Sequence, residues 1–135
     1  ACPWLIRRFV DPGAEILFVP ARDVLAVAER FDAEPFDVSG APLSHRGDRC
    51  TFDVLCNHFA LDTPALRTVA DTVRAADLGR PGDVPEAAGL LAISLGLSRL
   101  HRDDNAQLDA GMVVYDALYR WARDARAEHH DDSDT

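Results

Sequence analysis

Apolar residues recur at helical spacing along most of this chain, and turn or capping residues separate the helical segments. Each of three helix starts carries a capping signal: Thr51, Thr63 followed by Pro64, and Asp83 with Glu86 three residues later. The predicted helices span residues 4–10, 21–31, 51–59, 64–77 and 85–100, and a last one begins at Asp103 or Asp104. We therefore expect a mainly helical bundle.

Two of these helices carry specific packing predictions. The segment 21–31 places a stripe of apolar side chains on one face, which we expect in the core; the stripe is Val24, Leu25, Val27, Ala28 and Phe31. The segment 85–100 is apolar almost all round, which is typical of a helix enclosed on every side. We predict that it is the central, buried helix of the domain.

Two short β-type runs interrupt the helical pattern near the N-terminus. Residues 15–19 are mostly apolar and end at Pro20, and Pro35–Val38 forms a second run that we expect to pair with the first. The predicted fold class is mainly α (α+β), with one domain over residues 1–127 and a polar, disordered tail at 128–135. The intervening segment Ser39–Arg49 is a predicted loop, long enough to suggest a function.

Charge and composition narrow the classes of function. The 135 residues carry a formal net charge of −9, and no basic stripe emerges, so we expect no direct nucleic-acid binding by this domain. No apolar stretch is long enough to span a bilayer, so we expect no membrane association. Three cysteines without a CxxC pair indicate reduced thiols and a cytoplasmic location. The chain opens without Met and shows no signal peptide, so we expect it to be a piece of something longer.

Five separate blocks, in this order and spacing, resemble the C-terminal domain of the ChrB-type chromate-resistance proteins. The blocks are Ala1–Phe9, Pro35–Asp37, His45–Gly47 with Cys50–Phe52, Glu86–Leu91 and Gly111–Tyr119. The resemblance covers residue 1 to about residue 124, although an Asp-Arg pair that usually precedes the first block in the family is missing. It implies association with chromate-resistance operons, whose full-length protein is a chromate-responsive regulator, often with an additional N-terminal domain. The resemblance indicates a biological setting but does not identify a chemical reaction.

One group of side chains could hold a transition-metal ion. The candidate ligands are His45 in the long loop, Cys50, Asp53 in the first turn of the next helix, and Asp77 on the apolar face of the helix after it. Cys50 lies near a helix start, which predicts a lowered thiol pKa. The structural alternative has His45 hydrogen-bonded in its loop, Asp53 supporting the helix start, and Asp77 paired with Arg74 or Arg80.

A second group contains arginines that could grip a tetrahedral dianion such as chromate: Arg7, Arg8 and Arg46. The alternative for the adjacent pair Arg7 and Arg8 is an ion pair with Asp37 that ties the first helix to the β element. Cys56 lies on the apolar stripe of its helix, so we expect an inert core thiol.

Three hypotheses follow from these candidates. In the first, chromate or a metal ion linked to it changes the packing around His45–Asp53, and the domain regulates as a sensor. In the second, a His/carboxylate-bound ion makes the protein a redox or hydrolytic metalloenzyme. In the third, the domain is a helical protein-interaction module. The sequence leaves open whether the protein is an enzyme.

Overall fold

The computed structural model describes residues 1–31 and 50–133, and for residues 21, 31, 81 and 126–133 it describes the backbone alone. Six α-helices are assigned within these ranges, and π- or 3₁₀-helical turns at Ile6–Val10, Ala21–Asp23 and Pro81–Asp83 accompany them. The α-helices are α1 (Cys2–Leu5), α2 (Val24–Phe31), α3 (Thr51–His58), α4 (Pro64–Asp77), α5 (Pro85–Leu100) and α6 (Asp104–Ser133). The mainly helical prediction is confirmed.

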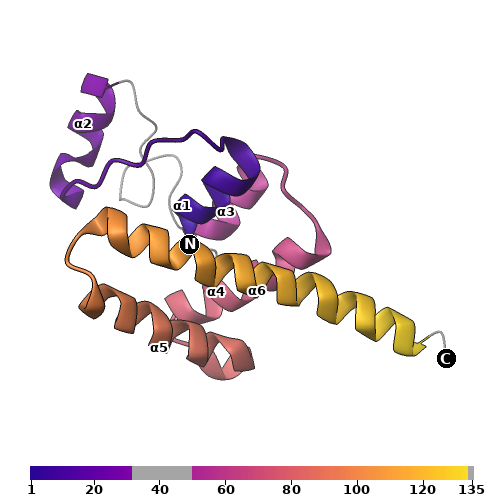
Figure 1. The fold of residues 1–135 in the computed structure, drawn as a ribbon. Helices are drawn as coiled ribbons and strands as arrows, with labels where there is room; N and C mark the ends of the chain where they lie inside the picture. The colour runs from indigo at the N-terminus through magenta and orange to yellow at the C-terminus, as the bar shows by residue number, and fades with distance from the viewer. Residues whose placement is uncertain (32–49, 134–135) are drawn as a thin grey trace.

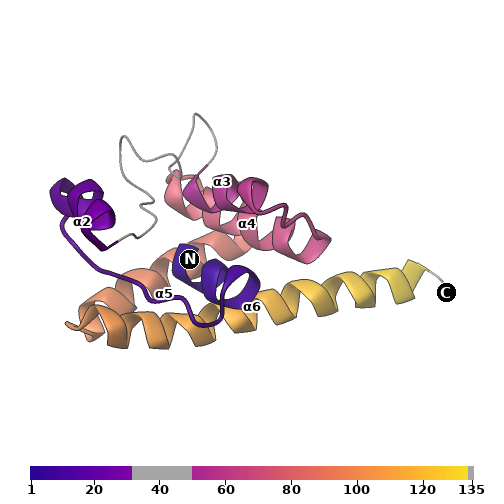
Figure 2. The ribbon, with the colours of Figure 1, turned by 90° about the horizontal axis from the view of Figure 1, so that it is seen from above.

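Helix α4 is the centre of the bundle. It contacts α3, α5 and α6, while α1 packs against both α3 and α6 (Figure 1). Helices α5 and α6 run antiparallel on either side of a short connection, and the C-terminal part of α6 projects beyond the other helices (Figure 2). None of the helices in the described ranges combines the length and hydrophobicity needed to cross a membrane.

Local hydrogen bonds explain several helix boundaries. The Thr63 hydroxyl accepts a hydrogen bond from the Leu66 N–H at 3.3 Å, which caps α4 as predicted. Beyond α4 the chain turns at Gly79, whose φ of +67° is strained for a side-chain-bearing residue. Asp103 caps α6 by accepting from the Ala106 N–H at 3.2 Å. The helix then continues into the segment predicted as a polar tail.

Two capping predictions were wrong. Helix α3 is capped by Cys50, and Thr51 is instead its buried first residue. The Asp83–Glu86 pattern forms no capping box, because Asp83 belongs to a separate 3₁₀ turn and the residue that precedes α5 is Val84, whose side chain makes no capping hydrogen bond.

The predicted β element is not supported. Residues 14–20 have no regular secondary structure, and the described residues contain no strand. The expected partner run, 35–38, lies outside the described residues. A run of β-type residues predicts a strand only where a second strand supplies hydrogen-bond partners, and segment 14–20 has none among the described residues.

The core lies between α1, α3, α4 and α6. Its largest fully buried side chains are Trp4, Leu5, Phe52, Leu55, Leu66, Val69 and Thr72. The prediction of a central α5 was wrong: it buries Ala87 and Leu90 against α4 and α6, whereas Ile93, Leu95 and Leu100 are exposed. When a helix is apolar on every side, its sequence does not indicate which face packs against the other helices.

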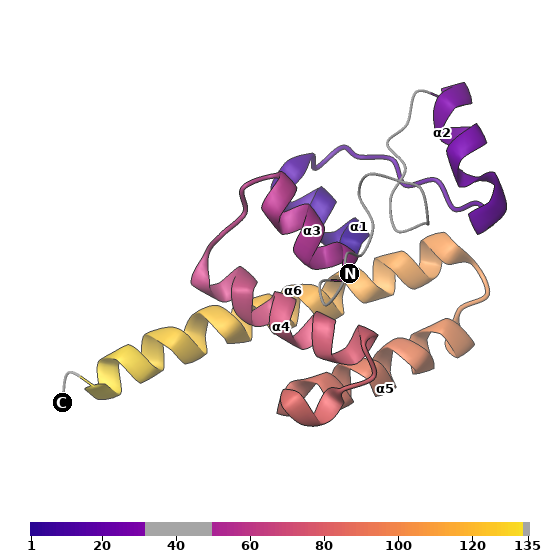
Figure 3. The same cartoon turned by 180° about the vertical axis from the view of Figure 1, so that it is seen from behind.

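Helix α2 is also less buried than predicted. It stands apart from the bundle and, among the described elements, contacts only the 3₁₀ turn that precedes it (Figure 3). Ala28 is buried, but Leu25 in the predicted core stripe is 47% exposed. The stripe is therefore buried only in part.

Candidate functional site

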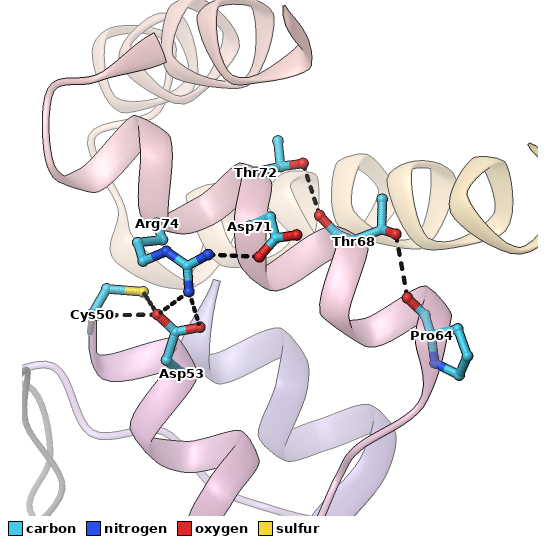
Figure 4. Close-up of polar contacts among 7 residues, drawn as sticks. All are labelled: Cys50, Asp53, Pro64, Thr68, Asp71, Thr72 and Arg74. Carbon is cyan, nitrogen blue, oxygen red and sulfur yellow. Dashed lines mark hydrogen bonds and ion pairs between the residues drawn. The ribbon is translucent and has the colours of Figure 1, made fainter. Parts of the chain in front are cut away.

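Asp53 is the hub of a polar network where α3 meets α4 (Figure 4). Only 9% of its side-chain surface is exposed. Its carboxylate accepts from the backbone N–H of Cys50 at 3.2 Å and from the Cys50 thiol at 3.4 Å, which closes the capping box at the start of α3. Asp53 thus supports its own helix start, as the structural interpretation of the sequence proposed.

Arg74, in the last turn of α4, neutralises Asp53 from across the helix interface. Its Nη1 donates to both carboxylate oxygens of Asp53 at 3.2 Å, and its Nη2 donates to Asp71 at 2.6 Å. One guanidinium therefore binds a nearly buried carboxylate on α3 and an exposed one on its own helix (Figure 4). A planar fork with five donors suits this double contact, which a lysine could not reproduce.

An open cavity of about 560 Å³ adjoins this network between α3 and α4. Its walls include Asp53, Cys56, Asp71 and Arg74 from the network side, together with Arg67, which pairs with Asp62 at 3.1 Å. Among the described residues, the wall of the cavity carries charges of both signs: three carboxylates and two guanidinium groups. A small ion entering here meets charged groups that already have partners, so its binding requires exchange of those partners.

The thiols of Cys50, which caps α3, and of Cys56, within α3, are poor nucleophiles. Burial, with the negative charge of Asp53, raises the pKa of Cys50 to about 11 and that of Cys56 to about 12. The sequence prediction of a lowered Cys50 pKa was wrong, because desolvation of the thiolate outweighs the favourable helix N-terminus. Cys56 is only partly buried and lines the cavity, so it is at the edge of the core.

The structure brings two of the four candidate metal ligands into direct contact, Cys50 and Asp53. Asp77 is exposed at the last turn of α4, not on its buried face as predicted; its negative charge contributes to the raised pKa of Cys50. His45 lies outside the described residues. In the described part of the chain no group of three or more His, Cys, Asp or Glu residues is placed to hold a metal ion.

The arginines of the second candidate group lie in different surroundings. The Arg8 guanidinium makes a bidentate ion pair with Asp116 of α6, at 3.0 Å and 2.9 Å, and the Trp4 indole donates to the same carboxylate at 2.7 Å. The Arg7 Nε–H donates to the Ala14 carbonyl oxygen at 3.4 Å. Arg46, like the alternative partner Asp37, lies outside the described residues.

Trp4 and Asp116 together fix α1 on α6. The Trp4 ring contacts Phe9, Phe52, Tyr115 and Tyr119, and its one polar atom is satisfied by Asp116. The two donors also lower the pKa of Asp116, the Arg8 hydrogen bond most of all. An oxyanion at Arg8 would have to displace this carboxylate.

Sequence reasoning missed three of these participants: Asp71, Asp116 and the pairing of Arg74 with Asp53. The structural alternative paired Asp77 with Arg74 or Arg80; Asp77 lies three residues after Arg74, whereas Asp53 lies 21 residues before it. A usable signal for Asp71 was its i, i+3 spacing to Arg74. Asp116 is 108 residues from Arg8, and no local pattern predicts such a pairing.

Two comparisons with known proteins give a match to this chain. The family model described as "ChrB, C-terminal domain" matches residues 1–122. Protein ChrB of Cupriavidus metallidurans is 39% identical over 120 residues, which make up 88% of this chain and 36% of that protein. The chain thus spans about a third of this relative's length. No solved structure is significantly similar to it. The chain belongs to the ChrB C-terminal domain family.

Proposed function

We propose that this domain serves chromate resistance as an effector-responsive regulatory domain. The effector is chromate or a metal ion linked to it, and the responsive element is the segment from His45 to Asp53. Family membership supports the biological setting. The observation on which the proposal depends is the charged contact between Asp53 and Arg74, which joins the end of this segment to the central helix α4.

This contact is sensitive to an incoming ion for an electrostatic reason. A carboxylate that is 9% exposed needs a positive partner, and Arg74 now supplies it. A metal ion taking Asp53 and a deprotonated Cys50, with His45 as a further ligand, would replace Arg74 as that partner. The freed guanidinium would keep Asp71, so α3 would lose its charged link to α4. Binding at one end of the segment would thereby change helix packing.

Direct chromate binding is the other version of the same proposal, through Arg7, Arg8 and Arg46. Here the dianion would compete with Asp116 for the Arg8 guanidinium, which would loosen α1 from α6. In either version the effector exchanges partners in an existing ion pair. DNA contact belongs in this proposal to another domain of a full-length protein, because this domain carries a formal charge of −9.

Thermal unfolding of the purified domain tests the proposal. The ligands are chromate, sulfate as a tetrahedral dianion of the same charge, and divalent transition metals added singly. A ligand at about a hundred times its dissociation constant stabilises the fold by about 2.7 kcal/mol. We expect stabilisation by chromate or a metal, and the shift with sulfate measures how much of the chromate effect any tetrahedral dianion produces. If no chromate or metal ligand shifts the transition, the sensor proposal is refuted.

Metal analysis of the protein as isolated addresses the metalloenzyme alternative. A stoichiometric transition metal would favour it, and a metal-free protein that still responds to an added ion would favour the sensor. Asp53→Asn discriminates further, because it removes the charged ligand while preserving the acceptor oxygen for the Cys50 N–H. We expect this variant to lose the response to metal and to keep its fold.

A further inference from the structure

Helix α5 lies at the edge of the bundle and presents one apolar face to solvent (Figure 1). Its contacts with α4 and α6 bury Ala87 and Leu90 on the opposite side of the helix. The outer face of α5 consists of six exposed residues on one side of the helix: Ala88, Gly89, Ala92, Ile93, Gly96 and Leu100. Residues 87–98 include no charged residue. A surface without charges is typical of the centre of a protein–protein interface.

Two glycines make the middle of the outer face flat. Gly89 and Gly96 are seven residues apart, about two helical turns, so they lie on nearly the same line along the helix. A Cβ added at either position would meet no atom within 4 Å, so packing inside the described domain does not require glycine there. Glycine inside a helix costs about 1 kcal/mol relative to alanine. The two glycines allow another helix to approach the backbone of α5 closely.

The outer face is complementary to itself. Gly89 and Gly96 are equally far from the midpoint of the helix segment, which lies between residues 92 and 93. The only charged residues of α5, Glu86 and Arg99, are also equally far from that midpoint. If two antiparallel copies of α5 met about a two-fold axis at this point, Gly89 would lie opposite Gly96 of the second copy. Glu86 would lie at the level of Arg99 of the second copy, so opposite charges would meet at both ends of the contact.

We propose that the outer face of α5 is the contact surface of a two-fold symmetric dimer of this chain, with the two copies of α5 packed antiparallel. A second copy is favoured over an unrelated partner because a two-fold contact requires every pair of residues to occur twice. The glycines and the charged residues of α5 meet this requirement. The dimer is independent of the proposed response to chromate or metal.

The size of the contact indicates a weak, reversible dimer. Helix α5 has 16 residues and is about 24 Å long, and a single helix pair of this length buries less than the roughly 1,200–2,000 Å² of a stable interface. The formal charge of −9 on each copy also opposes association. We therefore expect monomers in dilute solution and dimers in concentrated solution.

Sedimentation equilibrium of the full chain tests for the dimer. Between about 10 μM and about 1 mM protein, the mass should rise reversibly from that of one chain, 14.8 kDa, toward twice that value. A mass that remains that of one chain at about 1 mM would overturn the proposal. Assembly that continues beyond two chains would also overturn it, because a two-fold contact closes at the dimer.

Gly96→Leu tests whether the outer face forms the contact. The added side chain starts in open space within a single chain, so the dilute variant should keep its fold and its melting temperature should not fall. Dimerisation should weaken by at least about tenfold, because the leucine separates the two helices. The control is Trp121→Ala on α6, which removes a side chain that is 44% exposed outside this face. A dimer that survives Gly96→Leu, or is lost in Trp121→Ala, would refute the assignment.

Charge reversal tests the antiparallel arrangement. Glu86→Arg and Arg99→Glu should each weaken dimerisation by about fivefold, the ratio that corresponds to about 0.5 kcal/mol for each of two exposed ion pairs. An equimolar mixture of the two variants should regain the dimer, because each variant supplies the charge that the other lacks. Single variants that dimerise like the original chain, or a mixture no stronger than either variant alone, would refute this arrangement.

Discussion

Replacing Arg74 with Met should destabilise the domain by about 2 kcal/mol. The change removes both 3.2 Å contacts to Asp53 and leaves a carboxylate that is 9% exposed without its positive partner. Breaking a fully buried pair costs about 3–5 kcal/mol, and an exposed pair contributes about 0–1 kcal/mol. The Arg74 side chain is 36% exposed, and the Cys50 N–H still supports Asp53, so an intermediate cost is expected.

Chemical and thermal unfolding measure this cost. For a domain of this size, about 2 kcal/mol corresponds to a fall of about 8 °C in the melting temperature. The matched control is Arg120→Met, which breaks an exposed i, i+4 pair with Asp124 and should cost no more than about 0.5 kcal/mol. Equal losses in the two variants would show that the Asp53–Arg74 contact is an ordinary surface pair, and would refute the reasoning.

Three further predictions concern other parts of the fold. Asp116→Asn should cost about 1 kcal/mol, measured by urea unfolding. The Arg8 and Trp4 side chains lower the pKa of Asp116 from 3.8. The stabilisation of the fold by the ionised carboxylate is therefore present above about pH 4 and is lost as the pH falls through the folded-state pKa. The difference in stability between Asp116→Asn and wild type should shrink in acid, and a constant difference would contradict the ion pair. Cys50 and Cys56, with pKa values raised to about 11 and 12, should react with iodoacetamide at pH 7.5 far more slowly than the same thiols in urea, as followed by intact mass; equal rates would contradict their burial. Thr63→Ala removes the cap of α4 and should cost about 1 kcal/mol in the same unfolding assay, and a change below a few tenths would show that the 3.3 Å bond contributes little.

The sequence predicted the helices where local chemistry decides them. The Thr63–Pro64 start of α4 and the start of α6 at Asp103 or Asp104 depend on neighbouring residues alone, and both are confirmed. Burial was harder to predict. Helix α5 is apolar on every side, so periodicity could not identify the face that meets α4, and much of the opposite face remains exposed.

The candidate site was predictable only as far as its local part. The capping role of Asp53 follows from its place three residues after Cys50. Its pairing with Arg74 depends on how α3 packs against α4, which no spacing along the chain encodes. The Cys50 pKa was predicted in the wrong direction because burial, a property of the whole fold, outweighs the helix end.

The guanidinium signal of Arg74 in an NMR titration reports most directly on whether ligand binding is coupled to the α3–α4 contact. During titration with a divalent metal that stabilises the domain, the Arg74 Nε–H resonance should shift in proportion to the bound fraction. The Arg120 resonance should stay in place. Saturable binding that leaves Arg74 unmoved would contradict a coupling through Asp53.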